Sequence, residues 1–294
     1  MGLVLSIKYL SHHKLVKKER FRAFGRYVRF NIATRILNVP VILDYVEGTQ
    51  LLVQRGMASG ATNYYVYLED YAEMMFLLHY LTEDDAFVDV GANIGAYSLL
   101  AGSVIGAHTI AFEPCPESFE YLRRNVCINP RNNRYELYPY AVGDKDKQAT
   151  ITTKLGIANR VVENQGEDTV NIQMRCLDNV CVSLEPALLK IDTEGYEKKV
   201  LYGAEKTLKK NSLKAIIIEL NGGGNKYGCS DEQTHLFLSQ YGFKPATYDP
   251  EKRSLVVNTT WNKEGRNTIY VRSVEEVRKR VSSARAFLIG NRRL

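Results

Sequence analysis

Acidic side chains stand directly after several apolar runs that are predicted as buried strands. They are Asp89, Glu113, Asp192, Glu194 and Glu219. The carboxyl ends of parallel strands meet at one edge of a sheet. Carboxylates that converge there are costly unless a cationic or hydrogen-bonding ligand lies among them. The sequence therefore predicts a ligand site at this edge.

A glycine loop follows the first of these strands, in the run Asp89-Val90-Gly91-Ala92-Asn93-Ile94-Gly95. A dinucleotide site would carry G-x-G-x-x-G, whose additional glycine brings the backbone against a pyrophosphate. That glycine is missing here, and position 93 is Asn. The loop therefore favours a ligand that needs close backbone approach but carries no phosphate. S-adenosylmethionine, a nucleoside joined to an amino acid through a sulfonium, fits this description.

Three acids are candidate ligands of such a cofactor. Glu113 lies about 20 residues beyond the loop, where an acid accepts hydrogen bonds from a ribose diol. Asp89 could hold the loop by accepting backbone N–H groups, or it could face the ammonium group of the ligand. Asp144, which follows the third predicted strand, could reach an adenine amino group or simply form a Gly-Asp turn.

The run Asp192-Thr193-Glu194 offers groups for a reaction. A carboxylate here could orient an acceptor hydroxyl or take its proton during methyl transfer, an in-line displacement in which positioning dominates. The same two acids could instead cap the helix that follows. With Glu219 they form the candidate catalytic set. These three could also hold Mg²⁺, but no spacing demands a metal, and none is assigned.

Strands and helices that alternate from residue 87 onward must position these groups. Predicted strands cover 87–90, 107–112, 136–142, 188–191, 215–220, 244–248, 254–257 and 268–271. Two more, 150–153 and 170–173, form an excursion around a polar loop. This order predicts an α/β fold, a Rossmann-like and mostly parallel doubly wound sheet with helices on both faces.

The N-terminal arm is basic. Residues 1–35 hold nine Lys or Arg and one acid, against a net charge of +6 for the whole chain. Phe21, Phe24, Val28 and Ile32 recur at helical spacing, with arginines on other faces. Such a helix could lie on an anionic membrane surface. We favour the ordinary arrangement, in which the apolar stripe packs on the domain and the arginines face water.

The rest of the composition indicates a reduced, cytoplasmic protein, with the arm as its one candidate for peripheral membrane contact. The cysteines are odd in number and show no C-x-x-C pair, which argues against a disulfide framework or a zinc site. No apolar run reaches the roughly 18 residues of a membrane span. Outside the arm there is no basic footprint, so we expect no DNA partner. Oligomeric state is left open.

With these residues in view, the sequence resembles the FkbM family of S-adenosylmethionine-dependent methyltransferases. Three blocks carry the resemblance: 88–95, 112–119 with the following Asn125 and Asn129, and 189–197. It implies a class I methyltransferase fold and O-methylation of a small-molecule, glycan or glycolipid hydroxyl. It also implies cofactor contacts, at Asp89, Gly91, Ala92, Asn93, Gly95 and Glu113.

We expect four parts along the chain. Residues 1–40 form the basic helical arm, and 41–80 form a hairpin and a helix that lead into the core. Residues 81–272 form the S-adenosylmethionine-dependent methyltransferase domain, and 273–294 form a C-terminal helix.

Other acceptors remain as alternatives. Base-directed amino methyltransferases resemble one another in a proline-containing run where this chain has Asp192-Thr193-Glu194-Gly195. A cytosine-C5 enzyme needs a nucleophilic cysteine, and Cys115 lies instead near the expected ribose. A protein or RNA acceptor, or a non-catalytic module that only binds the cofactor, are the competing functions.

Overall fold

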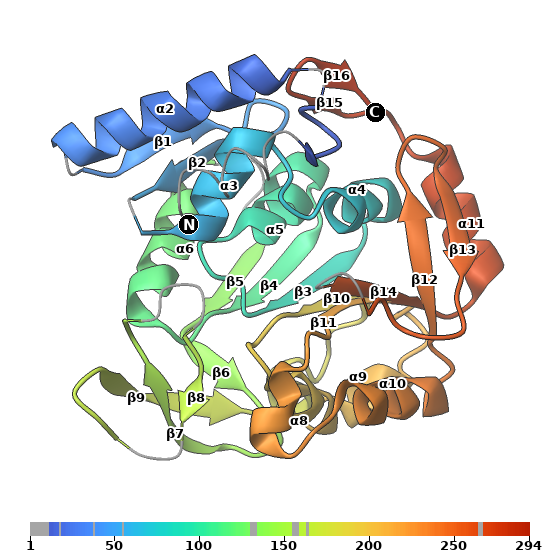
Figure 1. Ribbon diagram of the computed structural model, residues 1–294. Coiled ribbons are helices and arrows are strands. Elements are labelled where there is room, and N and C mark those ends of the chain that lie inside the picture. The colour runs from blue at the N-terminus through green and yellow to red at the C-terminus, as the bar shows by residue number, and fades with distance from the viewer. Residues whose placement is uncertain are drawn as a thin grey trace.

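An open sheet of eight strands forms the centre of the molecule (Figure 1). The computed structural model describes residues 12–17, 19–37, 39–54, 56–129, 134–154, 159–162, 165–263 and 267–294. The strands of the central sheet are β3 Ala86–Val90, β4 His108–Phe112, β5 Tyr135–Tyr138, β10 Pro186–Ile191, β11 Ala215–Glu219, β12 Lys244–Asp249, β13 Ser254–Val257 and β14 Asn267–Val271. They lie in the order β13-β12-β14-β11-β10-β3-β4-β5.

The middle of the sheet is parallel. Strands β5, β4, β3, β10 and β11 pair in parallel in that order. Strand β14 runs antiparallel to β11, and β12 and β13 continue antiparallel pairing to the edge. Parallel pairing brings the carboxyl ends of β3, β4, β10 and β11 to one edge. The predicted mostly parallel α/β sheet is confirmed.

Helices cover both faces of this sheet (Figure 1). One face carries α4 Tyr71–Tyr80, α5 Ala96–Leu99 with its π-helical continuation Leu100–Ile105, and α11 Val274–Ser283; the other carries α8 Glu197–Tyr202, α9 Glu205–Lys209 and α10 Asp231–Gln240. Successive strand side chains point to opposite faces. Leu188 and Ile217 therefore join one core, and Leu189 and Ile216 join the other. Because these strands carry apolar side chains on both faces of the sheet, helices must pack against both faces.

Two smaller sheets flank the centre. Strands β1 Val41–Asp44 and β2 Gln50–Val53 form the predicted hairpin. Beyond β5, a sheet in the order β6-β9-β7-β8 contains β6 Tyr140–Val142, β7 Lys147–Thr152, β8 Val161–Val162 and β9 Thr169–Arg175. The single strand predicted at 136–142 is wrong, because Pro139 has no N–H and separates β5 from β6. Strand β6 then pairs with β9 instead.

Several helix bounds also differ from prediction. The segment after β10 divides into α8 and α9, and α7 Leu177–Val180 precedes it. Helix α6 Pro116–Cys127 follows β4, and α3 Ala58–Val66 was not predicted. The last helix ends at Ser283, and Leu288 lies in a terminal hairpin of β15 Leu288–Ile289 and β16 Arg292–Arg293. The C-terminal part is thus a helix and a hairpin.

The N-terminal helix corrects one expectation. The first 11 positions of the predicted arm lie outside the described residues, and α2 spans Arg20–Leu37. The expected packing of its apolar stripe is wrong: Phe21 is 87% exposed, Phe24 40% and Ile32 52%. The helix packs through Ala23 and Phe30 instead. Within the described parts of the chain, no helix is long and apolar enough to cross a membrane.

Candidate active site

The loop between β3 and α5 has a backbone shape that requires glycine. Gly91 has φ 82° and Gly95 has φ 95°, both in the left-handed region. A Cβ on Gly91 would lie 1.8 Å from the backbone oxygen of Asp192. The loop therefore passes directly against the end of β10, and only a residue without a side chain permits that approach.

Strand β4 holds the same loop from the other side. The N–H groups of Gly91 and Ala92 donate to the Phe112 carbonyl at 2.9 and 3.0 Å. Asn93 has φ 52°, and its Oδ1 accepts the N–H of Ile94 at 2.8 Å. Asn tolerates this conformation because its short polar side chain bonds the local backbone. The loop backbone is thus fixed beside the cleft.

Glu113, at the end of β4, is buried against this loop. Its Oε2 accepts the N–H of Asn93 at 2.8 Å, and its Oε1 accepts the N–H of Cys115 at 2.9 Å. Burial raises the pKa of Glu113, the two N–H groups lower it, and Asp89 and Asp192 raise it, to about 7. A carboxylate oxygen accepts more than one hydrogen bond. Glu113 can therefore hold the loop and still accept hydroxyl donors.

Asp89 is fully buried at the end of β3 and lines the cleft. Its Oδ2 accepts the Ser98 hydroxyl at 2.7 Å, and among the described residues its Oδ1 has no hydrogen-bond partner. Burial raises the pKa of Asp89, and the charge of Lys190 opposes that shift. The hydroxyl that donates to Asp89 belongs to Ser98 on α5 and not to the glycine loop. Of the two predicted roles, the geometry favours the one that faces a ligand ammonium group.

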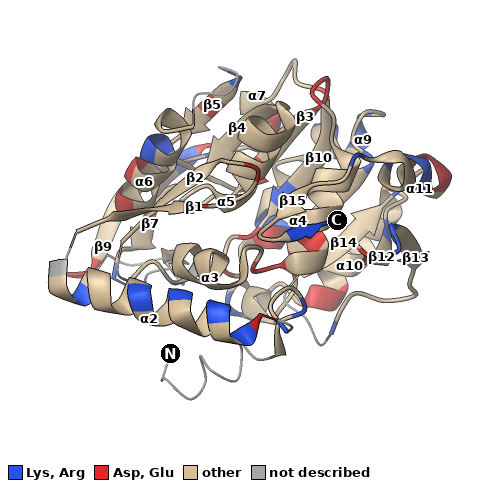
Figure 2. Ribbon diagram, turned by 90° about the horizontal axis from the view of Figure 1, so that it is seen from above, with Lys and Arg blue, Asp and Glu red and all other residues tan. Residues whose placement is uncertain are grey.

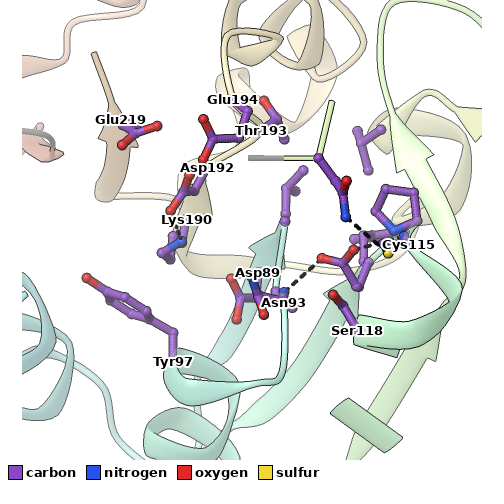
Figure 3. Close-up of a pocket in the computed structure, with 18 of the residues that line it drawn as sticks. Asp89, Asn93, Tyr97, Cys115, Ser118, Lys190, Asp192, Thr193, Glu194 and Glu219 are labelled. Carbon is purple, nitrogen blue, oxygen red and sulfur yellow. Dashed lines mark hydrogen bonds and ion pairs between the residues drawn. The ribbon is translucent and has the colours of Figure 1, made fainter. Parts of the chain in front are cut away.

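The three candidate catalytic acids meet at the edge of the sheet. One carboxylate oxygen from each of Asp192, Glu194 and Glu219 lies within 4.8 Å of the others. Figure 3 shows them together, across the cleft from Cys115 and Ser118. The structure thus brings together the groups that the sequence singled out, and their part in catalysis stays a prediction.

The turn that carries two of these acids is held by Glu197. Glu197 Oε1 accepts the N–H groups of Thr193 and Gly195 at 2.9 and 3.0 Å, and the Thr193 hydroxyl at 3.1 Å. Glu194 and Gly195 both have positive φ, 56° and 108°. The residue that precedes α8 is Tyr196, without a side-chain cap. The turn therefore owes its shape to Glu197, and Asp192 and Glu194 face the cleft instead of capping α8.

Lys190 is a cleft residue that the sequence pattern did not single out. Its Nζ lies 3.1 Å from Asp192 Oδ2 and 4.7 Å from the ring centre of Tyr97. Burial alone would lower the pKa of Lys190, but Asp192 and Asp89 together raise it. The Tyr97 hydroxyl donates to Asp70 at 3.0 Å. The sequence did contain a signal for Lys190, because a lysine inside an apolar strand is a buried charge and requires a partner.

Asp144 lies outside the lining of the cleft, and its contact with an adenine amino group stays a prediction. It pairs with Lys199 at 3.2 Å. The preceding Ala141 and Val142 line the cleft instead. An apolar wall at that place suits the face of a flat ring. Gly95 is also absent from the residues that line the cleft, and it is the N-cap residue of α5.

The cleft has about 1280 Å³ of space, counting its open mouth. Among the described residues that line it, seven are acidic and two are basic, Lys190 and Arg160; the acids are Glu69, Asp70, Asp89, Glu113, Asp192, Glu194 and Glu219. This balance favours a cationic ligand. The space accommodates a nucleoside-sized ligand together with a second molecule.

Sheet order and site together define the class of the protein. The glycine loop follows a central strand, an acid ends the next strand, and the antiparallel β14 lies between β11 and β12. This is the class I methyltransferase fold that the sequence predicts, with its ligand cleft at the carboxyl ends of the strands.

Comparison with known proteins gives the family. A model of the methyltransferase FkbM domain matches residues 89–245, which is more than half of the chain. The chain belongs to the FkbM methyltransferase family. The matched segment begins at Asp89 and includes the loop, Glu113 and all three clustered acids.

Two curated relatives are similar to this chain. Hexuronic acid methyltransferase AglP of Haloferax volcanii is 30% identical over 152 residues, which cover 50% of this chain and 60% of AglP. Methyltransferase sdnD of Sordaria araneosa is 23% identical over 177 residues, 48% of this chain and 68% of sdnD. The chain therefore matches roughly two thirds or less of the length of these relatives.

Solved structures show more distant likeness. The precorrin-6y C5,15-methyltransferase of Geobacter metallireducens GS-15 has a TM-score of 0.40 and 12% identity, over 70% of this chain and 89% of that one. TYW2 of M. jannaschii, in complex with AdoMet, has a TM-score of 0.37 and 14% identity, over 80% of this chain and 87% of that one. Neither likeness adds to what the family match shows.

Proposed function

We propose that this protein is an S-adenosylmethionine-dependent O-methyltransferase whose acceptor is a hydroxyl of a sugar, glycolipid or natural product. One observation carries the proposal: a single cleft is lined both by the glycine loop with Glu113 and by the acids Asp192 and Glu194. The first group suits the cofactor, and the second suits an acceptor hydroxyl.

The residues present fit S-adenosylmethionine. Glu113 would accept the ribose hydroxyls, and the buried Asp89 Oδ1 would accept an ammonium N–H. Ala92 and Asn93 would contact the cofactor through the loop backbone. The net positive charge of the cofactor complements the acidic lining of the cleft. When bound, it supplies an electrophilic methyl group on sulfur.

The protein's own part in the transfer is positioning and proton removal. Asp192 or Glu194 would accept a hydrogen bond from the acceptor hydroxyl and take its proton as the new carbon–oxygen bond forms and the methyl–sulfur bond breaks, with a neutral thioether as the leaving group. Lys190, whose Nζ lies 3.1 Å from Asp192 Oδ2, would fix the direction of the Asp192 side chain. Because the electrophile is already activated, alignment contributes most of the rate and the base only assists.

A sugar acceptor has support from one relative. The relative from Haloferax volcanii is a hexuronic acid methyltransferase by name, at 30% identity. Hydroxyl-rich acceptors also suit a cleft end lined by carboxylates, because each carboxylate oxygen accepts O–H donors. We therefore rank saccharides and glycolipids first among the acceptors.

Calorimetry with S-adenosylmethionine tests the cofactor assignment. Glu113→Ala should weaken binding by about tenfold or more, since a charge-assisted pair of hydrogen bonds is lost. Glu117→Ala, an exposed change on the first turn of α6, is the matched control and should bind normally. Unchanged affinity in Glu113→Ala would show that this acid does not bind the cofactor.

The catalytic assignment needs a separate measurement. Asp192→Asn and Glu194→Gln should keep cofactor affinity near that of the wild type and lower turnover by about tenfold or more. Full activity in both variants would remove these acids from the reaction.

A further inference from the structure

We infer that the acidic end of the cleft binds a divalent cation of the Mg²⁺ type, held by Asp192, Glu194, Glu219 and the side-chain oxygen of Asn267. This inference rests on the proposed function and adds a metal to it. Mg²⁺ takes oxygen ligands, chiefly carboxylates with waters and substrate oxygens. One oxygen of each acid already lies within 4.8 Å of the others, which is close enough for a common ion.

Asn267 supplies the independent observation. It lies on β14 directly opposite Glu219 on β11, so the two side chains share a face of the sheet. Asn267 is 6% exposed and lines the same cleft. Among the described residues, its Oδ1 has no hydrogen-bond partner. A buried amide oxygen without a donor is costly in an apolar sheet, and a cation is the partner that completes it.

The charge balance of the cleft points the same way. Lys190 pairs with Asp192 at 3.1 Å, and the described lining of the cleft holds seven acids against two bases. Bound S-adenosylmethionine has a net charge of about +1, from its sulfonium, ammonium and carboxylate groups. A divalent ion supplies the remaining positive charge where the acids are closest.

The ion would give this site a defined chemistry. A hydroxyl bound to a divalent cation loses its proton more readily, so a carboxylate of ordinary basicity could then remove it. Two neighbouring oxygens of a saccharide could bind the same ion. The metal would therefore select acceptors with adjacent oxygen groups and orient one of them toward the cofactor.

Titration with Mn²⁺, followed by electron paramagnetic resonance on the full chain without cofactor, tests the inference. We expect one saturable Mn²⁺ site per chain that Mg²⁺ competes for. Glu194→Gln, Glu219→Gln and Asn267→Ala should each weaken binding by about tenfold or more. Glu232→Gln, an exposed change on α10, is the matched control. Thermal melting identifies any variant that does not fold.

Two results would overturn the metal site. One is the absence of saturable binding to the wild type. The other is binding that the three variants leave unchanged, which would place the ion elsewhere. Methyl transfer that continues in chelator, without Mn²⁺ binding, would leave the methyltransferase proposal intact. Saturable Mn²⁺ binding without methyl transfer to any acceptor would support the metal site and contradict the methyltransferase proposal.

A second inference comes from α2, independently of the cleft. We propose that the outward face of this helix lies on an anionic lipid surface. Phe21 is 87% exposed, Ile32 52% and Ile36 75%. These positions differ by 11 and 4 residues, so they lie along one side of the helix. Isolated exposed apolar residues are ordinary, but an aligned row is characteristic of a docking face.

The inner side of α2 shows that this row points away from the domain. Ala23, Phe30 and Thr34 are buried against the body of the protein. Arg26 donates to the Tyr65 carbonyl at 2.7 Å, which fixes the rotation of the helix. The helix lies along one edge of the molecule, and basic residues are spaced along its ribbon (Figure 2).

Charge decides between a lipid surface and a second copy of the chain. Helix α2 contains no acid, and Arg20, Arg22, Arg29 and Arg35 are exposed on it. The one acid beside it, Glu19, lies 3.9 Å from Arg22. Two such faces would repel each other, whereas anionic headgroups attract the arginines as the apolar row enters the interface.

Co-sedimentation with phosphatidylcholine vesicles, with and without phosphatidylserine, tests this face. The wild type should bind the anionic vesicles, and salt should weaken that binding. Phe21→Ser with Ile36→Ser should reduce it by about tenfold or more. Leu236→Ser, a similarly exposed residue on α10, is the control. Equal binding to both vesicle types would overturn the proposal, as would a dimer that the double variant dissociates without any effect on vesicles.

Discussion

At the scale of single residues, the cleft is organised by one carboxylate and one glycine. Glu113 joins the glycine loop to β4 through two backbone N–H groups. Gly91 lets that loop lie against the end of β10. Sequence spacing was sufficient to select both, because the spacing of a loop glycine and a strand-end acid follows from a strand–turn–helix unit.

The cofactor affinity should depend on pH through Glu113. Its pKa is raised to about 7, mainly by burial. The ionised form accepts ribose hydroxyls, so S-adenosylmethionine affinity should increase by about tenfold between pH 6 and pH 8. Glu113→Gln should remove most of this dependence. Calorimetry at a series of pH values measures the S-adenosylmethionine affinity of both proteins. The same pH dependence of affinity in Glu113→Gln as in the wild type would contradict the role of Glu113.

Gly91→Ala should disrupt the loop. The new Cβ would meet the backbone oxygen of Asp192, and φ 82° is strained for alanine. We expect the free energy of unfolding to fall by about 3 kcal/mol or more, measured by denaturant titration. Gly25→Ala in α2 is the control, because its Cβ would have open space and alanine favours helices. An equal effect of both changes would contradict the account.

Residues with long-range partners were not accessible from sequence. Asp144 pairs with Lys199, which is 55 positions away. Nothing in a Gly-Asp turn indicates that partner. Asn267 acquires its place only through the register of β14 against β11.

At the scale of elements, Asn125 of α6 and Asn129, just beyond the end of that helix, bind the N-terminal hairpin to the cleft. Asn125 accepts the Leu52 N–H at 2.6 Å and donates to the Leu52 and Ile94 carbonyls. Asn129 bonds both backbone groups of Gln50 in the same way. Side-chain amides thus take the place of a neighbouring strand along β2, and one of them also reaches the glycine loop.

Asn125→Ala should therefore affect both the hairpin and the loop. It removes the partner of the buried Ile94 carbonyl and of the partly buried Leu52 backbone groups, at a cost of about 2–3 kcal/mol in the free energy of unfolding. Asn171→Ala, which removes an exposed contact with Thr150, should change it by no more than about 0.5 kcal/mol. Denaturant titration measures the free energy of unfolding of both variants. An effect of Asn125→Ala as small as that of Asn171→Ala would contradict the role assigned to Asn125.

Periodicity predicted most elements and failed where tertiary partners decide. The alternation of strands and helices predicted the central sheet, and the hairpin was predicted as well. It did not separate β5 from β6, although Pro139 was a local signal. The apolar row of α2 was assigned to the core because burial is the usual fate of such a row. The structure instead buries the side with Ala23 and Phe30.

At the scale of the whole molecule, the chain joins an acidic cleft to a basic helix at its edge. The cleft lining has seven acids and two bases among its described residues, whereas α2 has five arginines and no acid. The two regions suit different partners, a cationic cofactor and an anionic surface. If the acceptor is a glycolipid, both proposals describe one event, since α2 would hold the cleft near the membrane.

The central claim is transfer of a methyl group to a hydroxyl. The most direct measurement is incorporation of label from methyl-labelled S-adenosylmethionine into a cell extract, separated afterwards into lipid, glycan, protein and RNA fractions. We expect label in the glycan or lipid fraction, stable to mild alkali as an ether is, and strongly reduced with Glu194→Gln. Alkali-labile label, label in protein or RNA, or cofactor binding without any transfer would contradict the account.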